Sequence, residues 1–143
     1  MKLAQLLAPL GITEGFMDVE ISDIVYDSRK AKAGCAFVCL RGSAVDGHKF
    51  AANAAAAGAA AIIAQEPVEA SGPQVVLVED TRRALALMSA AFFGNPAEGD
   101  ISVIGVTGTK GKTTTAYMIR SILEAAGHKT GVIGTIGVLM GRS

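Results

Sequence analysis

Short apolar runs along the N-terminal part of the chain are separated by polar, Gly-rich or Pro-rich stretches. Apolar runs of about four to eight residues bounded by turn residues are typical of buried strands, whereas apolar residues three or four positions apart are typical of helices. The pattern predicts strands at residues 19–26, 35–40, 59–64 and 74–78. It predicts helices at residues 1–11, 49–57 and 82–93, the first being short and amphipathic.

The strand–helix–strand order of residues 35–64 predicts parallel strands joined by a right-handed crossover. Asp80 or Thr81 is suited to cap the third helix, and the sequence Gly94-Asn95-Pro96 to end it. A polar segment follows at residues 97–100 and is typical of a linker. We therefore expect one domain at residues 1–98 and the start of another at 99–143.

The second segment predicts a β-branched strand at residues 101–106, a Gly/Thr/Lys turn, a helix at 112–126 and a strand at 130–134. One such unit is too small to bury both faces of a parallel sheet. We expect an α/β protein, in which a small N-terminal α/β domain precedes the first β–loop–α–β unit of a truncated second domain.

Composition limits the possible partners of the chain. Its 13 basic and 13 acidic residues balance, so the charge favours neither nucleic acid nor an anionic membrane. No apolar stretch approaches the roughly twenty residues that span a bilayer. Cys35 and Cys39 lie roughly 13 Å apart in an extended strand and cannot form a disulfide with each other. We expect them to be reduced, half-buried packing residues of a cytoplasmic protein.

The most specific chemical signal is the sequence Val106-Thr-Gly-Thr-Lys-Gly-Lys-Thr-Thr-Thr115, between a predicted strand and a predicted helix. A loop that holds a nucleotide's phosphates needs open backbone, inward N–H groups and a helix N-terminus. Gly108 and Gly111 supply the open backbone. Lys112 can reach the β- and γ-phosphate oxygens, and the Thr113 hydroxyl can ligate Mg²⁺. The predicted ATP contacts are Gly108, Thr109, Lys110, Gly111, Lys112, Thr113 and Thr114.

The competing interpretation is a Gly/Thr turn that only joins strand to helix and leaves Lys112 in solvent. Glu124, within the predicted helix, is the only carboxylate after the loop. We therefore expect this chain to hold a nucleotide without hydrolysing it. A guanine-reading Asn-Lys-x-Asp motif is missing, which disfavours a regulatory GTPase. A non-catalytic nucleotide-binding module remains an alternative.

The loop resembles the ATP-binding loop of the Mur ligases, whose usual form has Asn where this chain has Lys110. The resemblance continues upstream, through Asp27-Ser28-Arg29, Gly34-Cys35-Ala36-Phe37-Val38 and Asp46-Gly47-His48-Lys49-Phe50. Two branches of the family share this layout, one adding the third peptide residue and the other adding D-Ala-D-Ala. The segment Gly134-Thr135-Ile136-Gly137 is similar to the third-residue branch.

The resemblance implies an ATP- and Mg²⁺-dependent cytoplasmic ligase of peptidoglycan synthesis, monomeric at full length. Its substrates would be UDP-N-acetylmuramoyl-L-alanyl-D-glutamate and an amino acid, joined through an acyl phosphate. Lys112 would be the catalytic residue and Thr113 the metal ligand. The positions that match UDP contacts are Tyr26, Ser28, Ser43, Ala44 and Val45. A purely structural interpretation is also open for two segments. Residues 27–29 could be a turn whose polar groups bond to one another, and residues 46–48 could be a helix-capping loop.

Overall fold

The computed structural model describes residues 1–43, 45–99 and 101–141. The chain forms two compact units, one covering Met1–Ile101 and the other beginning at Ser102. The placement of a domain boundary after residue 98 stays a prediction. No helix in the described part of the chain is both long enough and apolar enough to cross a membrane.

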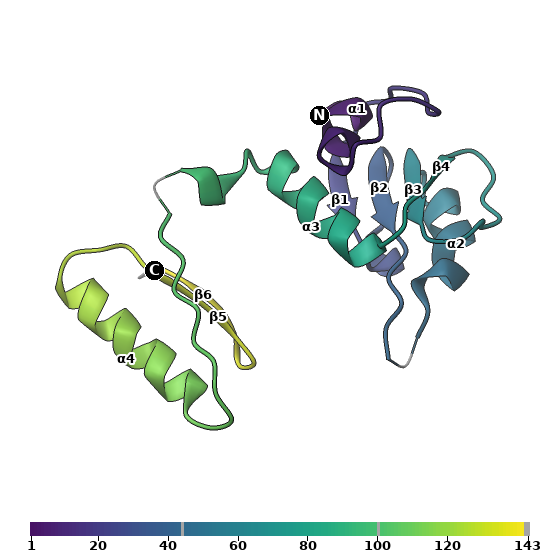
Figure 1. The fold of residues 1–143 in the computed structure, drawn as a ribbon. Helices are drawn as coiled ribbons and strands as arrows, with labels where there is room; N and C mark the ends of the chain where they lie inside the picture. The colour runs from purple at the N-terminus through teal and green to yellow at the C-terminus, as the bar shows by residue number, and fades with distance from the viewer. Residues whose placement is uncertain (44, 100, 142–143) are drawn as a thin grey trace. The chain divides into compact units, whose positions relative to one another are not determined.

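A four-stranded parallel sheet forms the centre of the first unit, in the order β1-β2-β3-β4 (Figure 1). The strands are β1 (Asp23–Val25), β2 (Cys35–Val38), β3 (Ala61–Ala64) and β4 (Gln74–Leu77). The parallel pairing predicted for residues 35–64 is confirmed by β2 and β3, in which Phe37 lies opposite Ile62. All four strands therefore place their carboxyl ends at one edge of the sheet.

The first strand is shorter than the predicted range of 19–26. Glu20 forms an antiparallel bridge with Lys2, and the Ile21 N–H donates to the Met1 carbonyl at 2.7 Å. Residues 19–21 of the predicted strand therefore pair with the chain's own N-terminus and not with the sheet.

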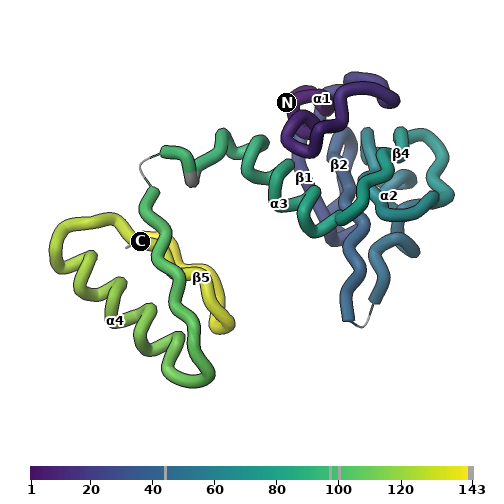
Figure 2. The backbone as a smooth tube through the Cα atoms, viewed as in Figure 1, coloured from purple at the N-terminus to yellow at the C-terminus, as the bar shows by residue number. Residues whose placement is uncertain are grey.

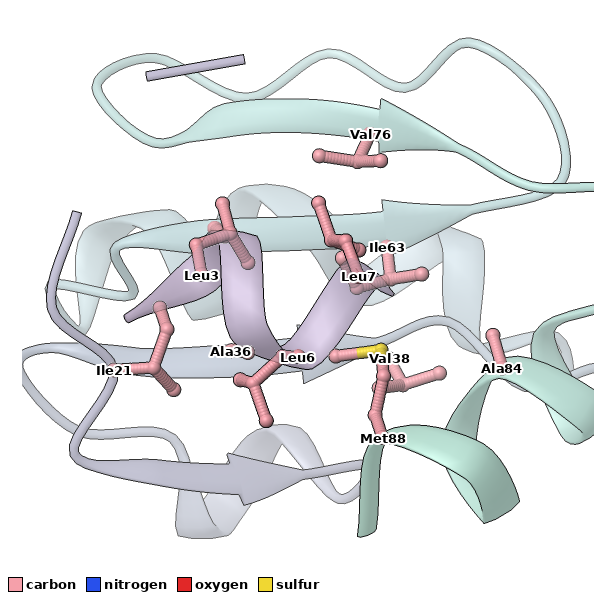
Figure 3. Packing of buried hydrophobic residues seen from close by; sticks show 11 residues of the cluster. Leu3, Leu6, Leu7, Ile21, Ala36, Val38, Ile63, Val76, Ala84 and Met88 are labelled. Carbon is pink, nitrogen blue, oxygen red and sulfur yellow. The ribbon is translucent and has the colours of Figure 1, made fainter. Parts of the chain in front are cut away.

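Helices cover both faces of the sheet. Helices α1 (Leu3–Leu7) and α3 (Thr81–Phe92) pack on one face, and α2 (Ala51–Ala56) packs on the other (Figure 1). Alternate residues of each strand point to opposite faces. In Figure 3 Leu6 and Met88 lie over the face that Val38 and Ile63 present.

The opposite face of the sheet buries both cysteines more fully than the sequence predicts. Cys35, Phe37 and Cys39 point toward α2 and are fully buried, so the two cysteines are not half-buried as predicted. Their thiols are free. The alanine-rich helix α2 lets the backbone approach this face closely, since Ala51 and Ala54 are its buried residues.

Capping side chains begin α3 and the 3₁₀ helix that leads into α2. The Asp80 carboxylate accepts hydrogen bonds from the N–H groups of Arg82 (2.8 Å) and Arg83 (3.1 Å), so Asp80 is the cap. Helix α3 begins at Thr81, one residue before the predicted start. Asp46 accepts from the His48 N–H at 3.0 Å and begins the 3₁₀ helix η3 (Gly47–Phe50), which runs into α2.

The second unit contains helix α4 (Lys112–Ala125) and a hairpin of β5 (Gly131–Gly134) and β6 (Gly137–Met140). The strand predicted at residues 101–106 is wrong, because the backbone there forms neither helix nor strand (Figure 1). Figure 2 traces the path of this segment toward α4. Its β-branched side chains favour a strand, but no described segment hydrogen-bonds to it as a neighbour. Strand β6 was not predicted and pairs antiparallel with β5.

Candidate functional site

The predicted phosphate loop ends at the N-terminus of the 14-residue helix α4. Gly111, the residue before the helix, has a φ of 77° and Gly108 has a φ of 148°, conformations that favour glycine. The first helical hydrogen bond runs from the Thr115 N–H to the Gly111 carbonyl at 2.9 Å. The preceding N–H groups of Lys112, Thr113 and Thr114 have no acceptor among the described residues. They are suited to bind an anion at the helix N-terminus.

The Lys112 side chain bends back over this loop. Its Nζ donates to the Gly108 carbonyl oxygen at 2.5 Å, which places the ammonium group beside the open N–H groups. All of the predicted ATP-contacting residues, from Gly108 to Thr114, are exposed. The loop therefore combines a positive charge, a helix N-terminus and accessible backbone donors, as phosphate binding requires.

The predicted oxygen ligand for a metal ion, the Thr113 hydroxyl, is exposed. This fits Mg²⁺, which commonly takes one or two protein ligands and completes its shell with water and phosphate oxygens. Glu124 has other partners and is not proposed as a metal ligand. Its Oε1 accepts from Arg120 Nε at 2.8 Å and from the Thr130 hydroxyl at 2.9 Å, which ties α4 to the segment before β5.

The residues predicted to contact UDP in the first unit follow strands β1 and β2. Tyr26 is 61% exposed, and Ser28 is half-buried at the start of a 3₁₀ turn. Asp27 is satisfied within this turn. It accepts from the Arg29 N–H and Nε at 3.0 Å each and from Nη2 at 2.7 Å, and these bonds lower the pKa of Asp27 to about 2. Tyr26 and Ser28 remain the available groups.

A tight loop follows β2 at the same edge of the sheet. Arg41 and Asp46 form an antiparallel bridge, and the Gly42 N–H donates to the Val45 carbonyl at 2.9 Å. Ser43 and Val45 are exposed on this loop, whereas Ala44 lies outside the described residues. Since β1 and β2 are parallel, the structure brings Tyr26, Ser28, Ser43 and Val45 to one edge.

Sequence reasoning missed a polar network at the same edge. Gln65 follows β3, and its N–H donates to His48 Nε2 at 3.0 Å. Its side chain donates to the Glu79 carbonyl and accepts from the Thr81 hydroxyl, each at 3.0 Å. The sequence feature that could have indicated Gln65 is its position, because it is the first polar residue after a fully buried strand.

Asp46, His48 and Glu66 have ligand atoms within 4.8 Å of one another, a spacing that could hold a metal ion. Both ring nitrogens of His48 are engaged, however, with Asp46 Oδ1 at 2.6 Å and with the Gln65 N–H. Cys39 is nearby, and its burial, followed by the charge of Asp46, raises the pKa of its thiol to about 12. The cluster therefore acts as a structural network and not as a metal centre or a nucleophilic site.

The comparisons with known proteins agree with this arrangement. Residues 20–93 match the model of the Mur ligase family, catalytic domain, and residues 106–142 match the Mur ligase middle domain. The UDP-N-acetylmuramoyl-L-alanyl-D-glutamate–2,6-diaminopimelate ligase of Bacillus cereus is 51% identical over 122 residues, which is 85% of this chain and 24% of that protein. The ligase of the same name from Clostridium perfringens is 47% identical over 131 residues, 91% of this chain and 27% of that protein.

Solved structures of Mur ligases share the fold. The UDP-N-acetylmuramoylalanyl-D-glutamyl-2,6-diaminopimelate–D-alanyl-D-alanyl ligase of Acinetobacter baumannii is 35% identical, with a TM-score of 0.64 over 85% of this chain and 27% of that one. The MurF ligase of Thermotoga maritima, solved in complex with ADP, is 32% identical, with a TM-score of 0.59 over 72% of this chain and 23% of that one.

The chain spans about a quarter of the length of the curated relatives it matches. The first family match alone covers more than half of the chain, and the second falls on the unit that carries the phosphate loop. The order of the two matches is the order of the two units, and on this evidence the chain belongs to the Mur ligase family.

Proposed function

We propose that the chain supplies two parts of an ATP-dependent ligase that adds 2,6-diaminopimelate to UDP-N-acetylmuramoyl-L-alanyl-D-glutamate in peptidoglycan synthesis. Residues 1–98 bind the UDP end of the substrate, and residues 99–143 begin the ATP-binding domain. The proposal depends most on the phosphate loop, where open N–H groups at the α4 N-terminus lie beside Lys112. The names of the relatives with 47–51% identity supply the amino acid.

In this function the chain's own residues bind and orient the nucleotide. The N–H groups of Lys112, Thr113 and Thr114 donate to phosphate oxygens, and Lys112 Nζ exchanges the Gly108 carbonyl for the β- and γ-phosphates. Thr113 offers its hydroxyl to Mg²⁺, which when bound offsets charge between the phosphates. Lys110, in place of the family's usual Asn, adds a second exposed positive charge to the loop.

The reaction proposed for the whole ligase is transfer of the γ-phosphoryl group of ATP to the substrate's glutamate carboxylate. The resulting acyl phosphate is attacked by the amine of the amino acid, forming the amide bond and releasing phosphate. Lys112 assists by holding the phosphoryl group in line and by balancing the charge that develops on its oxygens. The enzyme is proposed to act as a cytoplasmic monomer.

The uridine half of the site lies at the carboxyl edge of the N-terminal sheet, where parallel sheets commonly bind ligands. Tyr26 presents an exposed ring that can stack on the base, and Ser28 presents a hydroxyl. The 43–45 loop supplies Ser43, Ala44 and Val45. The bonds from Arg29 engage the Asp27 carboxylate within its own turn, which leaves the recognition of UDP to these neighbours.

A second candidate function is addition of the D-Ala-D-Ala dipeptide. The solved structure from Acinetobacter baumannii, at 35% identity, is of a ligase named for the D-alanyl-D-alanyl group. The higher identity of the diaminopimelate ligases favours the first candidate.

Calorimetry on this chain with UDP, ATP and GTP tests the two binding roles. We expect UDP to bind and Ser28→Ala to weaken it by about tenfold, the effect of losing one buried polar contact. Ser71→Ala, in an exposed loop after β3, is the matched control and keeps the affinity for UDP. A preference for GTP over ATP, or no response to UDP, contradicts the proposal.

A chimera tests the reaction. Replacing the matched quarter of the Bacillus cereus ligase with this chain should retain diaminopimelate addition to the UDP-muramoyl dipeptide. Activity only on a UDP-muramoyl tripeptide with D-Ala-D-Ala would support the second candidate instead.

A further inference from the structure

His48 is a buried residue whose two ring nitrogens have fixed and different partners. Its side chain is 5% exposed. Nδ1 lies 2.6 Å from Asp46 Oδ1, and Nε2 lies 3.0 Å from the backbone N of Gln65. A backbone N–H can only donate, so Nε2 must accept with its lone pair, and the single proton of the neutral ring belongs on Nδ1. The structure thus requires one protonation state and one tautomer.

The two partners of His48 belong to separate parts of the substrate edge. Asp46 closes the loop that carries residues 43–45, through its bridge with Arg41 and the adjoining bond from the Gly47 N–H to the Leu40 carbonyl at 2.8 Å. Gln65 is the first residue after β3. The imidazole therefore connects one end of the 43–45 loop to the end of the neighbouring strand.

The other end of the loop has its own connection to the same strand. Arg41 Nη2 forms an ion pair with Glu66 Oε2 at 2.6 Å, and the Arg41 carbonyl accepts from Arg82 Nη2 at 2.6 Å. Those groups are exposed, so solvent and salt weaken them. The His48–Gln65 bond is the buried connection and is expected to hold the loop more firmly.

We propose that His48 is a positioning residue for UDP binding, which holds the loop that carries Ser43 and Val45 against the end of β3 by accepting the Gln65 N–H at its Nε2. This rests on the proposed function, because it assigns the 43–45 loop to the uridine site. The loop's affinity for UDP then depends on an acceptor at Nε2 and not on the bulk of the ring.

A proton on His48 Nε2 would break the bond from the Gln65 N–H. Among the described residues, the charged groups near His48 are Asp46 and Glu66, whose oxygens lie within 4.8 Å of a ring nitrogen, and Arg41, which pairs with Asp46 at 3.4 Å. Hydrogen bonds from the His48 backbone N–H and then from its ring lower the pKa of Asp46, which favours the ionised carboxylate as the acceptor for Nδ1–H. An Nε2–H would face the Gln65 N–H, and the connection to β3 would be lost.

Two substitutions of His48 distinguish the function of Nε2 from that of Nδ1. His48→Gln places an amide oxygen near the Nε2 position and can still accept from the Gln65 N–H. His48→Asn reaches only the Nδ1 position, so it keeps a donor for Asp46 and leaves Gln65 without an acceptor. UDP calorimetry should show an affinity within about threefold of the unsubstituted chain for His48→Gln and a loss of about tenfold for His48→Asn.

Nitrogen-15 NMR of the unsubstituted chain reads the tautomer directly, and we expect the proton on Nδ1. Equal affinities for both variants, or a proton on Nε2 at neutral pH, would overturn the positioning role.

The same experiment distinguishes this inference from the proposed function. If the unsubstituted chain shows the Nδ1 tautomer but no UDP binding, the uridine site fails and the positioning role fails with it. If UDP binds and Ser28→Ala weakens binding while His48→Asn does not, the uridine site stands and the positioning role alone is refuted.

Discussion

Gly47 and Leu40 are in direct backbone contact across the base of the 43–45 loop. The Gly47 N–H donates to the Leu40 carbonyl at 2.8 Å. A Cβ at Gly47 would lie 2.7 Å from both the backbone nitrogen and the backbone oxygen of Leu40. Backbone atoms cannot move aside as a flexible side chain can, so glycine is required here by close approach.

Gly47→Ala should therefore open the loop base and destabilise the first unit by about 1–3 kcal/mol, the usual cost of overpacking. Urea denaturation of the purified chain measures this change in the free energy of unfolding. Gly99→Ala is the control, since its Cβ would meet only the Pro96 carbonyl at 3.6 Å, an ordinary contact. Equal stability of the two variants would show that the loop base is not packed as described.

The central strand gives a second test of stability. Phe37 is fully buried in β2 between β1 and β3, and Phe37→Ala should cost about 3–5 kcal/mol through lost burial and an unfilled cavity. Phe93 is 71% exposed at the end of α3, where its ring meets Phe92 edge-on at 5.3 Å. Phe93→Ala should cost less than about 1 kcal/mol. A comparable loss in both variants would contradict the assignment of the core.

The sequence predicted the first unit well because its signals are local. Each strand of the sheet is a short apolar run, and a capping carboxylate, Asp80, precedes α3. The predicted strand from Ile101 to Val106 is wrong because β-branched composition does not reveal whether a neighbouring strand is present. Strand β6 was missed because its pairing depends on a turn between Gly134 and Gly137.

In the candidate site, too, the local features were predictable from the sequence and the tertiary contacts were not. The phosphate loop was predictable, since Gly108, Gly111 and Lys112 act over a few consecutive residues. The connection from His48 to Gln65 was not, because it joins residues 17 positions apart and depends on how β2 and β3 pair. Contacts of that kind follow from tertiary structure and leave no spacing pattern in the sequence.

The pair formed by Asp27 and Arg29 predicts a specific acid response. The pKa of Asp27 is lowered from 3.8 to about 2, chiefly by hydrogen bonds from the Arg29 side chain and backbone. A lowered pKa in the folded state stabilises the protein above pH 3.8, and this contribution is lost as the pH falls toward 2. The stability difference between the unsubstituted chain and Asp27→Asn should thus be constant near neutrality and shrink over that interval.

Carbon-13 NMR of the Asp27 carboxyl group checks the cause. Arg29→Gln should raise its pKa toward the ordinary value, although the backbone donor at residue 29 remains. Added salt should also raise it, because the Arg29 side chain is 87% exposed and its charge is screened. An unchanged pKa in Arg29→Gln would assign the shift to some other group.

The two cysteines predict the behaviour of thiol reagents. Cys35 and Cys39 are fully buried, and the pKa of the Cys39 thiol is raised to about 12. Since the thiolate is the reactive form, a disulfide reagent should label neither cysteine of the folded chain at mildly alkaline pH. Both should react in guanidinium chloride. Labelling of Cys39 at the rate of a free thiol under native conditions would show that α2 does not cover this face.

The phosphate loop gives the last prediction. Lys112→Ala removes the ammonium group beside the open N–H groups, and calorimetry should show ATP affinity reduced by at least about tenfold, as for a lost charge-assisted hydrogen bond. UDP affinity should not change, because the uridine residues lie in the first unit.

Matched lysine variants identify the reason for that loss. Lys129→Ala removes an equal charge beyond the far end of α4 and should leave ATP affinity unchanged. Lys110→Asn restores the residue usual in the family at this position. It should keep ATP bound with a weaker dependence on salt, because one fewer cation faces the phosphates. If Lys129→Ala weakens ATP as much as Lys112→Ala, the attraction is the general charge of the unit and Lys112 has no specific place in the loop.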